Sequence, residues 1–453
     1  MNKTFIDMMI EKARIGQVEF EKFNQEQVDS VVKAMGKVIY DNAEILAKEA
    51  VEETKMGVYE DKVAKNKGKS KTIWNSLKNK KSIGIIDEDK DAGLISIAKP
   101  IGVICAVTPT TNPIVTPMCN AMFALKGGNA IIIAPHPRSK NSSAHAVKLM
   151  NEEIKKLGAP DNLIQIIEEP SIELTNELMQ KSDVVLATGG MAMVKSAYSS
   201  GKPSFGVGAG NVQVVLDRDI DFVEATKKVI SGRIFDNGII CSGEQSVIVP
   251  QDKYNEVVEA MEANGTYYAE DESIVSKFRD VIFKNGLING DVVGQSVQFI
   301  ADLAGVEVPQ ETKVILLKPT GVAKADLLCK EKMCPVMIIL PYNTFEEAIE
   351  IAQSNLELEG KGHTAAIHSN NQEHIKYAGL NLTVSRLVVN APSSTTAGGS
   401  FFNSFSPTTT LGCGTWGNNS ISENLNYKHL INVSRIATVR GEITAPTDDE
   451  IWG

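Results

Sequence analysis

Hydrophobic positions in the first part of the chain repeat at helical spacing. Apolar residues recur three or four positions apart, as at Val28, Val31, Val32 and Met35. This period places them on one face of a helix and predicts helices over 4–77. Two short apolar runs then flank an acidic turn at 82–97, which predicts a β-hairpin. A projecting hairpin exposes strand edges, so pairing with another chain is expected.

Beyond residue 100, short apolar runs alternate with amphipathic segments in two series. The first series predicts strands at 102–107, 130–134, 163–167, 183–187 and 212–216, and helices at 117–125, 142–157, 172–181, 191–199 and 219–235. The second predicts strands at 246–249, 313–317, 336–340, 364–367 and 386–389, and helices at 252–263, 274–283 and 345–354. Such alternation predicts an α/β fold with parallel, doubly wound sheets. These sheets bind cofactors at the carboxyl ends of their strands.

Composition and charge narrow the class of protein. The chain has 453 residues, 43% hydrophobic and 23% charged, with a net charge of −10. This is typical of a globular protein of two or three domains, and the acidic balance argues against nucleic-acid binding. A basic stretch at 65–81 is expected to be a solvated helical face, or else to attract an anionic substrate. The absence of a long apolar run or a signal-peptide core predicts no membrane association.

Six cysteines are scattered without C-x-x-C spacing, so neither a metal site nor a disulfide framework is expected, and a reducing cytoplasm is favoured. One of them, Cys241, follows a turn at Gly238 and lies at the junction of the two series, where a cleft is expected. A cysteine on such a loop is a candidate nucleophile, and its backbone N–H can stabilise a negatively charged oxygen. The alternative is a small buried apolar residue.

Polar or glycine-rich turns follow three strands of the first series, at 108–113, 135–140 and 188–190. They are expected to face a nucleotide. The stretch 206–211, Gly-Val-Gly-Ala-Gly-Asn, is similar to a dinucleotide fingerprint but precedes a strand instead of following one. By itself it therefore predicts no nucleotide site.

Several motifs in order resemble one family. They are Thr-Thr-Asn-Pro at 110–113, Pro-His-Pro-Arg at 135–138, the stretch 206–211, Asn-Gly-Ile-Ile-Cys at 237–241, Glu-Lys-Met-Cys-Pro at 331–335, Gly-His-Thr at 362–364 and the run 407–417. With them nearly the whole chain resembles the CoA-acylating branch of the aldehyde dehydrogenase family. The resemblance implies an aldehyde dehydrogenase-like α/β fold. Its parts would be a Rossmann-like cofactor domain (1–81 and 101–235), a catalytic domain (236–430) and an oligomerisation arm (82–100 and 431–453), within a homodimer or tetramer.

The resemblance also implies a reaction. Cys241 would take the acyl group of an acyl-CoA as a thioester and release coenzyme A, and a nicotinamide cofactor would then reduce the thioester to an aldehyde. Within the branch the chain looks most similar to members that convert succinyl-CoA to succinate semialdehyde. Acetyl-CoA or another short acyl-CoA is the alternative substrate, and a non-redox cysteine acyltransferase is the alternative from a different class. Hydrolytic members carry a water-activating glutamate where this chain has Phe205, Gly206 and Val207.

Site roles follow from the same resemblance. Asn112, or its neighbour Thr111, would stabilise the carbonyl oxygen. His363 would carry a proton, unless it is a hydrogen-bonded core histidine. Arg138 and Lys140 favour NADP, with NAD possible. The expected cofactor contacts are Thr108, Pro109, Thr110, Pro135, His136, Pro137, Arg138, Thr188, Gly189, Gly190, Val207, Gly208, Glu331 and Leu411.

A succinyl group brings a second carboxylate that needs a partner when buried. Lys69 is the preferred candidate, although an exposed surface lysine is the alternative. Ser242 and Thr111 are expected beside the substrate. Arg233 and Arg386 are less favoured candidates for the carboxylate.

Overall fold

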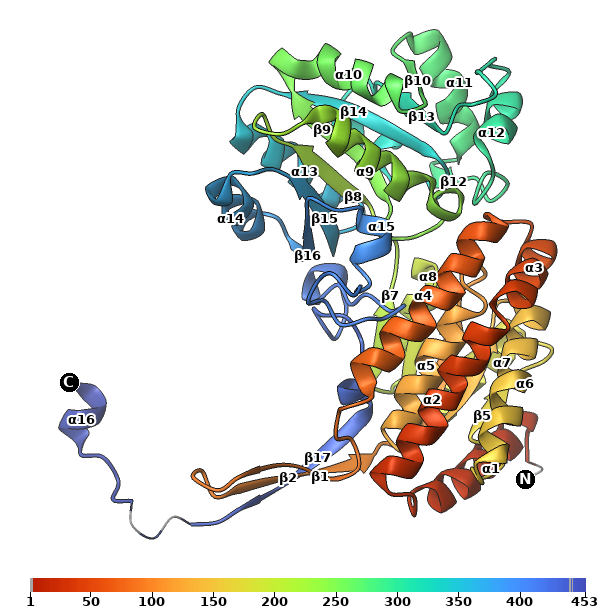
Figure 1. Cartoon of the computed structure of the whole chain (residues 1–453), viewed down its shortest axis with the longest axis vertical. Helices are drawn as coiled ribbons and strands as arrows, with labels where there is room; N and C mark the ends of the chain where they lie inside the picture. The colour runs from red at the N-terminus through yellow and green to blue at the C-terminus, as the bar shows by residue number, and fades with distance from the viewer. Residues whose placement is uncertain (1–2, 440, 442) are drawn as a thin grey trace.

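The molecule consists of two α/β units and a thin arm that projects from one of them (Figure 1). The computed structural model describes residues 3–439, 441 and 443–453. Positions 1–2, 440 and 442, which fall in the predicted segments 1–81 and 431–453, lie outside the described residues. No helix among those described is long and apolar enough to cross a membrane.

Four helices open the chain, as the periodicity predicts. They are α1 (Phe5–Phe20), α2 (Gln25–Asp41), α3 (Ala43–Thr54) and α4 (Tyr59–Leu77). Thr4 and Asn24 cap the first two, each accepting a backbone hydrogen bond three residues on, and such caps satisfy otherwise unpaired helix donors. The apolar faces of these helices pack in one core with the strands of the first sheet.

The first sheet is parallel, with strand order β5-β4-β3-β6-β7. Its strands are β3 (Val103–Thr108), β4 (Ala130–Pro135), β5 (Ile164–Ile166), β6 (Val184–Thr188) and β7 (Ser204–Val207), and its helices are α5 (Val115–Lys126), α6 (Lys140–Lys156), α7 (Ile172–Lys181) and α8 (Met191–Tyr198). The chain runs outward from β3 through β4 and β5, then returns to place β6 on the other side of β3. The boundary between β3 and β6 is therefore the topological switch point, where ligands of such sheets bind.

The second sheet is also parallel, with order β10-β13-β14-β9-β8-β15-β16. Its strands are β8 (Val212–Leu216), β9 (Glu244–Pro250), β10 (Thr266–Ala269), β13 (Val314–Leu317), β14 (Val336–Tyr342), β15 (Gly362–His368) and β16 (Val384–Val389). The helices around it are α9 (Phe222–Ile234), α10 (Tyr254–Ala263), α11 (Glu272–Ile282), α12 (Val297–Ala304), α13 (Phe345–Leu358), α14 (Gln372–Asn381) and the short α15 (Ser393–Thr396). A small hairpin, β11 (Phe283–Lys284) and β12 (Leu287–Ile288), lies apart.

One strand belongs to a different sheet than expected. The run 212–216 was grouped with the first series, but β8 pairs with β9 and β15 in the second sheet. That grouping was wrong because an apolar strand has the same pattern in either sheet, and its partners are set by long-range packing. The link from β7 to β8 therefore crosses from one unit to the other (Figure 1).

The predicted hairpin and the C-terminal strand form the arm. Strands β1 (Gly84–Asp89) and β2 (Leu94–Pro100) pair antiparallel, and β17 (Ile431–Ala437) pairs antiparallel with β2. The pairing of β1 with β2 confirms the predicted hairpin. The three-stranded sheet extends away from the body, and the chain ends in the short α16 (Asp448–Trp452) beyond it (Figure 1).

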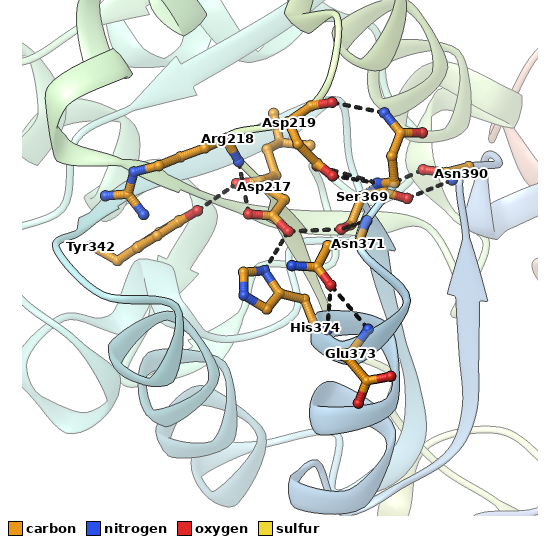
Figure 2. A network of polar contacts seen from close by, with 11 residues as sticks. Asp217, Arg218, Asp219, Tyr342, Ser369, Asn371, Glu373, His374 and Asn390 are labelled. Atoms are coloured by element: carbon orange, nitrogen blue, oxygen red, sulfur yellow. Dashed lines mark hydrogen bonds and ion pairs between the residues drawn. The ribbon is translucent and has the colours of Figure 1, made fainter.

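Side chains at the carboxyl ends of β8, β14 and β15 form a polar network (Figure 2). Asp217 accepts a hydrogen bond from Ser369 Oγ at 2.7 Å and contacts His374 Nδ1 at 2.7 Å. Tyr342 donates to the Leu216 carbonyl at 3.0 Å. Because Cys241 precedes β9 at the opposite, amino-terminal edge of this sheet, the network joins strand ends away from the candidate site.

Candidate active site

The loop that carries Cys241 reverses the chain between α9 and β9. Asp236 and Asn237 both have positive φ, 54° and 52°, and Gly238 follows with φ 69°. A tight turn then forms in which the N–H of Gly243 donates to the Ile240 carbonyl at 2.8 Å. These turns leave Cys241 half-buried, whereas the other five cysteines are buried.

Cys241 opens onto a cavity of about 380 Å³. Four of the expected site residues line it with Cys241, namely Lys69, Asn112, Ser242 and Leu411. They come from α4, the turn after β3, the nucleophile loop and the C-terminal stretch. The cavity therefore joins residues from both units around the cysteine. Thr111 lies beside Asn112 but is not among the lining residues.

Lys69 extends from α4 into this cavity. Its Nζ donates to the Gly398 carbonyl at 2.8 Å. Among the described residues no carboxylate pairs with it, and burial lowers its pKa to about 8. Lys69 thus has the position and the remaining donor capacity to receive an anion.

The basic stretch is not uniformly solvated. The side chain of Lys65 is 8% exposed and forms an ion pair with the buried Asp236. The expectation of a solvated face fails here because α4 packs against the nucleophile loop. A buried cation needs a partner, and Asp236 supplies it.

Asn112 has unused hydrogen-bonding capacity. Its Nδ2 lies 3.5 Å from Thr111 Oγ, a long contact, and its buried Oδ1 has no partner within the described chain. Buried amide groups are normally satisfied, so such an orphaned amide fits a ligand-binding role.

The two arginines considered for the distal carboxylate are occupied elsewhere. Arg233 is fully buried and donates to the backbone carbonyls of Cys334 and Glu244. Arg386 donates to Thr364 Oγ, Asn424 Oδ1 and the carbonyls of His363 and Gly412. Neither lines the cavity. The sequence could not exclude them because their partners lie far away along the chain.

His363 is fully buried at the start of β15. Its Nδ1 lies 3.0 Å from Thr364 Oγ, while Nε2 has no partner among the described residues. Burial, with a smaller contribution from the Arg386 charge, lowers its pKa to about 3, so the ring is neutral near pH 7. A Cβ built at Gly210 would lie 3.3 Å from the His363 ring and 1.8 Å from the Cys241 carbonyl oxygen. His363 therefore lies close to the nucleophile loop.

The electrostatics around the Cys241 thiol favour its neutral form. Burial, with help from the nearby Glu331 carboxylate, raises the pKa of Cys241 to about 12. Burial and Glu359 in turn raise the pKa of Glu331 to about 8, so this carboxyl is mostly protonated near pH 7. One Glu331 oxygen accepts from the Gly210 N–H at 3.2 Å.

The expected cofactor residues gather at one edge of the first sheet. Thr108, Pro135, Thr188 and Val207 end the adjacent strands β3, β4, β6 and β7. Pro109 and Thr110 continue from β3, and Thr188 Oγ lies 3.2 Å from Thr410 Oγ of the stretch that lines the cavity. The strand-end site and the Cys241 cavity are therefore neighbours.

This edge fits a dinucleotide. Gly189 and Gly190 precede α8, and open space surrounds their Cα atoms, so a phosphate could approach the backbone closely. A Cβ built at Gly208 would meet the Met191 side chain, which would have to move. The buried hydroxyls of Thr108 and Thr110 have no partner within the described residues.

The turn after β4 is exposed at His136, Pro137 and Arg138. His136 Nδ1 accepts from the Arg138 N–H, and partial burial of its ring, together with the Arg138 charge, lowers its pKa. Lys140 pairs with Glu169, whereas the Arg138 guanidinium makes no ion pair with any described residue. Of the two cations considered for a 2′-phosphate, Arg138 is the one without a competing carboxylate.

Sequence reasoning missed part of the cavity wall. Ser394, Phe401, Phe402, Thr408 and Thr409 line it. Glycine, serine and threonine are frequent at 393–410, which indicates an irregular segment, but no local pattern showed that it folds over Cys241. In the described part of the chain, no three His, Cys, Asp or Glu side chains gather closely enough to hold a metal ion.

Comparisons with known proteins agree with this geometry. A family model described as the aldehyde dehydrogenase family matches residues 1–270. The chain is 61% identical to a succinate-semialdehyde dehydrogenase (acetylating) of Clostridium kluyveri, with 100% of both chains covered. It is 42% identical to a sulfoacetaldehyde dehydrogenase of Acholeplasma, covering 98% of this chain and 93% of that relative.

Solved structures show the same fold. An acetylating aldehyde dehydrogenase of Geobacillus thermoglucosidasius superimposes with a TM-score of 0.94 at 36% identity, over 97% of this chain and 98% of that one. An engineered glycolyl-CoA reductase with bound NADP⁺ has a TM-score of 0.84 at 29% identity, over 96% of each chain. A Rhodopseudomonas palustris propionaldehyde dehydrogenase with bound CoA and an acylated cysteine has a TM-score of 0.84 at 28% identity, over 96% and 97% of the chains. The chain therefore belongs to the aldehyde dehydrogenase family.

Proposed function

We propose that this protein reversibly reduces succinyl-CoA to succinate semialdehyde and coenzyme A through a thioester on Cys241. The observation that carries this proposal is the cavity that holds Cys241, Asn112, Ser242 and Lys69 together. It combines a nucleophile, an amide donor and a cation, which are the groups that an acyl chain with a distal carboxylate needs. The relative of 61% identity bears the name of that activity.

In the proposed reaction the Cys241 sulfur attacks the acyl carbonyl, and the bond to the CoA sulfur breaks. The backbone N–H of Cys241 and the Asn112 amide donate to the carbonyl oxygen as negative charge develops on it. When bound, the nicotinamide cofactor supplies the hydride that reduces the thioester. The sulfur of Cys241 then leaves as a thiolate, which releases the aldehyde, and a proton taken up from water restores the thiol.

Burial keeps the Cys241 thiol neutral, so it must lose a proton as it attacks, and this proton ends on the departing CoA sulfur. Neutral His363 is the proposed hydrogen-bonding partner for this transfer, through its unpaired Nε2. Protonation of Glu331 reduces the negative charge that faces the thiol and so favours its ionisation. Glu331 is also proposed to hold the ribose hydroxyls of the cofactor.

The preference for coenzyme A over water follows from residues 205–207. Hydrolytic members place a glutamate there, but this chain has Phe205, Gly206 and Val207, and the Phe205 ring packs edge-on against His429. Without a carboxylate to activate water at this point, the CoA thiolate is the stronger nucleophile toward the thioester.

The cofactor is proposed to be NADP, with NAD as the alternative. Arg138 is exposed beside the strand-end site and is available for a ribose 2′-phosphate. The described segments contain six free cysteines, which supports a reducing compartment, and we place the protein in the cytoplasm. The arm is proposed to assemble the chain into a homodimer or tetramer.

The deciding experiment is a panel of acyl-CoA thioesters assayed with NADPH and with NADH by nicotinamide absorbance. Succinyl-CoA is expected to give the highest kcat/KM, and Cys241→Ala is expected to be inactive with every substrate. Acyl exchange without cofactor oxidation would instead support the non-redox acyltransferase. A clear preference for acetyl-CoA would overturn the assignment of succinyl-CoA.

A further inference from the structure

The backbone just before Cys241 adopts a conformation that is rare for residues other than glycine. Asp236 and Asn237 are consecutive and both lie in the left-handed region. Asparagine and aspartate tolerate this region better than most residues, but each such residue still costs free energy. A turn of this kind persists only where its surroundings hold it.

The Asp236 side chain is held entirely by residues at the start of α4. One carboxylate oxygen accepts from the Val58 N–H at 2.9 Å. The other forms ion pairs with Lys62 at 3.0 Å and Lys65 at 2.5 Å, and all three side chains are buried. The backbone N–H of Asp236 donates to Asp61 at 2.8 Å. Thus both the carboxylate and the backbone donor of this residue are anchored to one helix.

A second contact fixes the next residue. Asn237 Nδ2 donates to the Gly294 carbonyl at 3.0 Å, and the same carbonyl accepts from the Gly57 N–H at 2.9 Å. The turn is therefore fixed from both the N-terminal helices and the second unit. Because α4 also carries Lys69, one helix sets the positions of the nucleophile loop and of the cavity cation.

We infer that Asp236 is a positioning residue for Cys241. Its carboxylate, held between Lys62 and Lys65, locks the left-handed turn so that the thiol faces Asn112 across the cavity. This inference rests on the proposed role of Cys241 as the nucleophile. Removing the carboxylate leaves two buried lysines without their shared partner and frees the turn, so the thiol moves relative to the amide donor.

The test is Asp236→Asn, compared with a matched control. Asp29→Asn removes a different ion pair, between Asp29 of α2, whose side chain is 22% exposed, and the fully buried Lys126 of α5. For each protein we would measure Tm, kcat and KM for the acyl-CoA, and the rate at which iodoacetamide alkylates Cys241 in the folded molecule. The alkylation rate needs no acyl-CoA turnover, so it reads the position and reactivity of the thiol directly.

Asp236→Asn is expected to lower kcat about ten- to a hundredfold, because displacement of a reacting group by about 1 Å has effects of this size. Its alkylation rate per folded molecule should depart from the wild-type rate, because freeing the turn changes the burial that raises the pKa of the Cys241 thiol. KM should stay within about twofold, since the cavity walls remain. Asp29→Asn should lower Tm and leave both rates unchanged. A loss of activity in Asp236→Asn with a wild-type alkylation rate per folded molecule would overturn the inference.

A second pair of variants covers the case in which Asp236→Asn does not fold. Lys62→Met removes one of the two ion pairs of Asp236 and leaves the pair with Lys65. The chain is therefore expected to fold, with Asp236 held less firmly. This substitution should change the alkylation rate several-fold, and Lys62→Arg should return the rate toward the wild-type value. A wild-type rate in Lys62→Met would overturn the inference. If wild-type Cys241 proved dispensable for turnover, the proposed function would fail instead, so the two failures are distinguishable.

Discussion

At the scale of single residues, Lys69 is the side chain that we propose to determine the choice of substrate. Its ammonium faces the cavity with a backbone carbonyl as its protein partner. The relatives of 61% and 42% identity are named for succinate semialdehyde and sulfoacetaldehyde, aldehydes that carry a distal carboxylate and a distal sulfonate. The Lys69 ammonium can pair with either anion, whereas a neutral acyl chain would leave the charge of this ammonium without a partner.

Replacing Lys69 by methionine keeps the stem and removes the charge. We expect KM for succinyl-CoA to rise about ten- to a hundredfold, because a charge-assisted hydrogen bond is worth about 1.5–3 kcal/mol. KM for acetyl-CoA should change little. Steady-state kinetics with both thioesters check this, and equal effects on the two would remove Lys69 from the recognition of the carboxylate.

The same residue predicts a dependence on pH. Burial lowers the pKa of Lys69 to about 8, so the ammonium is charged below this pH and becomes neutral above it. Affinity for the distal carboxylate is therefore present at neutral pH and lost as the pH rises. Between about pH 7 and pH 9.5, KM should rise for succinyl-CoA and not for acetyl-CoA. Lys69→Arg stays charged over this range, so its KM for succinyl-CoA should not rise with pH. The same pH dependence in Lys69→Arg and in the wild type would contradict the role of Lys69.

The carbonyl oxygen gives a third prediction at this scale. Asn112→Ala should lower kcat about a hundredfold, because one oxyanion donor is worth about 3 kcal/mol. Thr111→Val is the matched control, since Thr111 is adjacent but does not line the cavity. Single-turnover measurements of acyl transfer compare the two. A larger loss in Thr111→Val would assign the oxyanion contact to Thr111.

At the scale of elements, the nucleophile loop is confined by the segment that links the two sheets. A Cβ at Gly210 would lie 1.8 Å from the carbonyl oxygen of Cys241, which is far inside van der Waals contact. The absence of a side chain at this position is therefore a requirement of the packing between the β7–β8 link and the loop. No comparable restriction applies to Gly379 of α14, where the nearest atom is 3.9 Å from a built Cβ.

Gly210→Ala should accordingly displace the loop and destabilise the protein by about 1–3 kcal/mol, as overpacking does. We also expect kcat to fall at least tenfold, since the Cys241 backbone must move. Gly379→Ala should leave kcat unchanged and keep or slightly raise stability. Chemical denaturation and steady-state kinetics test both. Wild-type values for Gly210→Ala would show that the loop relaxes without cost.

At the scale of the whole molecule, the site lies between the carboxyl edge of the first sheet and the amino edge of the second. The strand ends of β3 and β6 flank the switch point, and the loop before β9 faces them. Neither unit alone contains both the strand-end turns and the cysteine. The polar network at the other edge of the second sheet (Figure 2) lies outside this cleft, and its role is to join strand ends.

The arm leads to a prediction about the proposed assembly of the chain. Its strands leave two free edges, and Ile85 and Ile436 are more than half exposed on it. We expect Ile436→Asp to shift the assembly toward monomers by at least tenfold in Kd, about 1.4 kcal/mol. Sedimentation velocity measures this. The control is Leu287→Asp, which changes an exposed leucine on β12, away from the arm. Equal effects of the two would indicate that the arm is not the interface.

The local sequence pattern was sufficient for much of the fold. The helices α1–α4, the hairpin and most strands followed from periodicity, because burying one face of an element requires a fixed spacing of apolar residues. Strands β7 and β10 and helices α12 and α14 were not predicted. The turn before Cys241 was recognised, but its two left-handed residues were not, since asparagine and aspartate are common in many kinds of turn.

What the sequence determined by itself was therefore local: the elements, the strand-end turns and the cysteine between the two series. Tertiary structure decided which residues meet. It placed β8 in the second sheet, turned Lys69 toward Cys241 and buried Lys65 against Asp236, 171 positions away. The physical reason is that the spacing of apolar residues shows that one face of an element is buried. It does not show which other element covers that face. Contacts between distant segments depend on how the whole chain packs. A lysine that forms a buried ion pair therefore has the same local sequence pattern as a lysine that faces solvent.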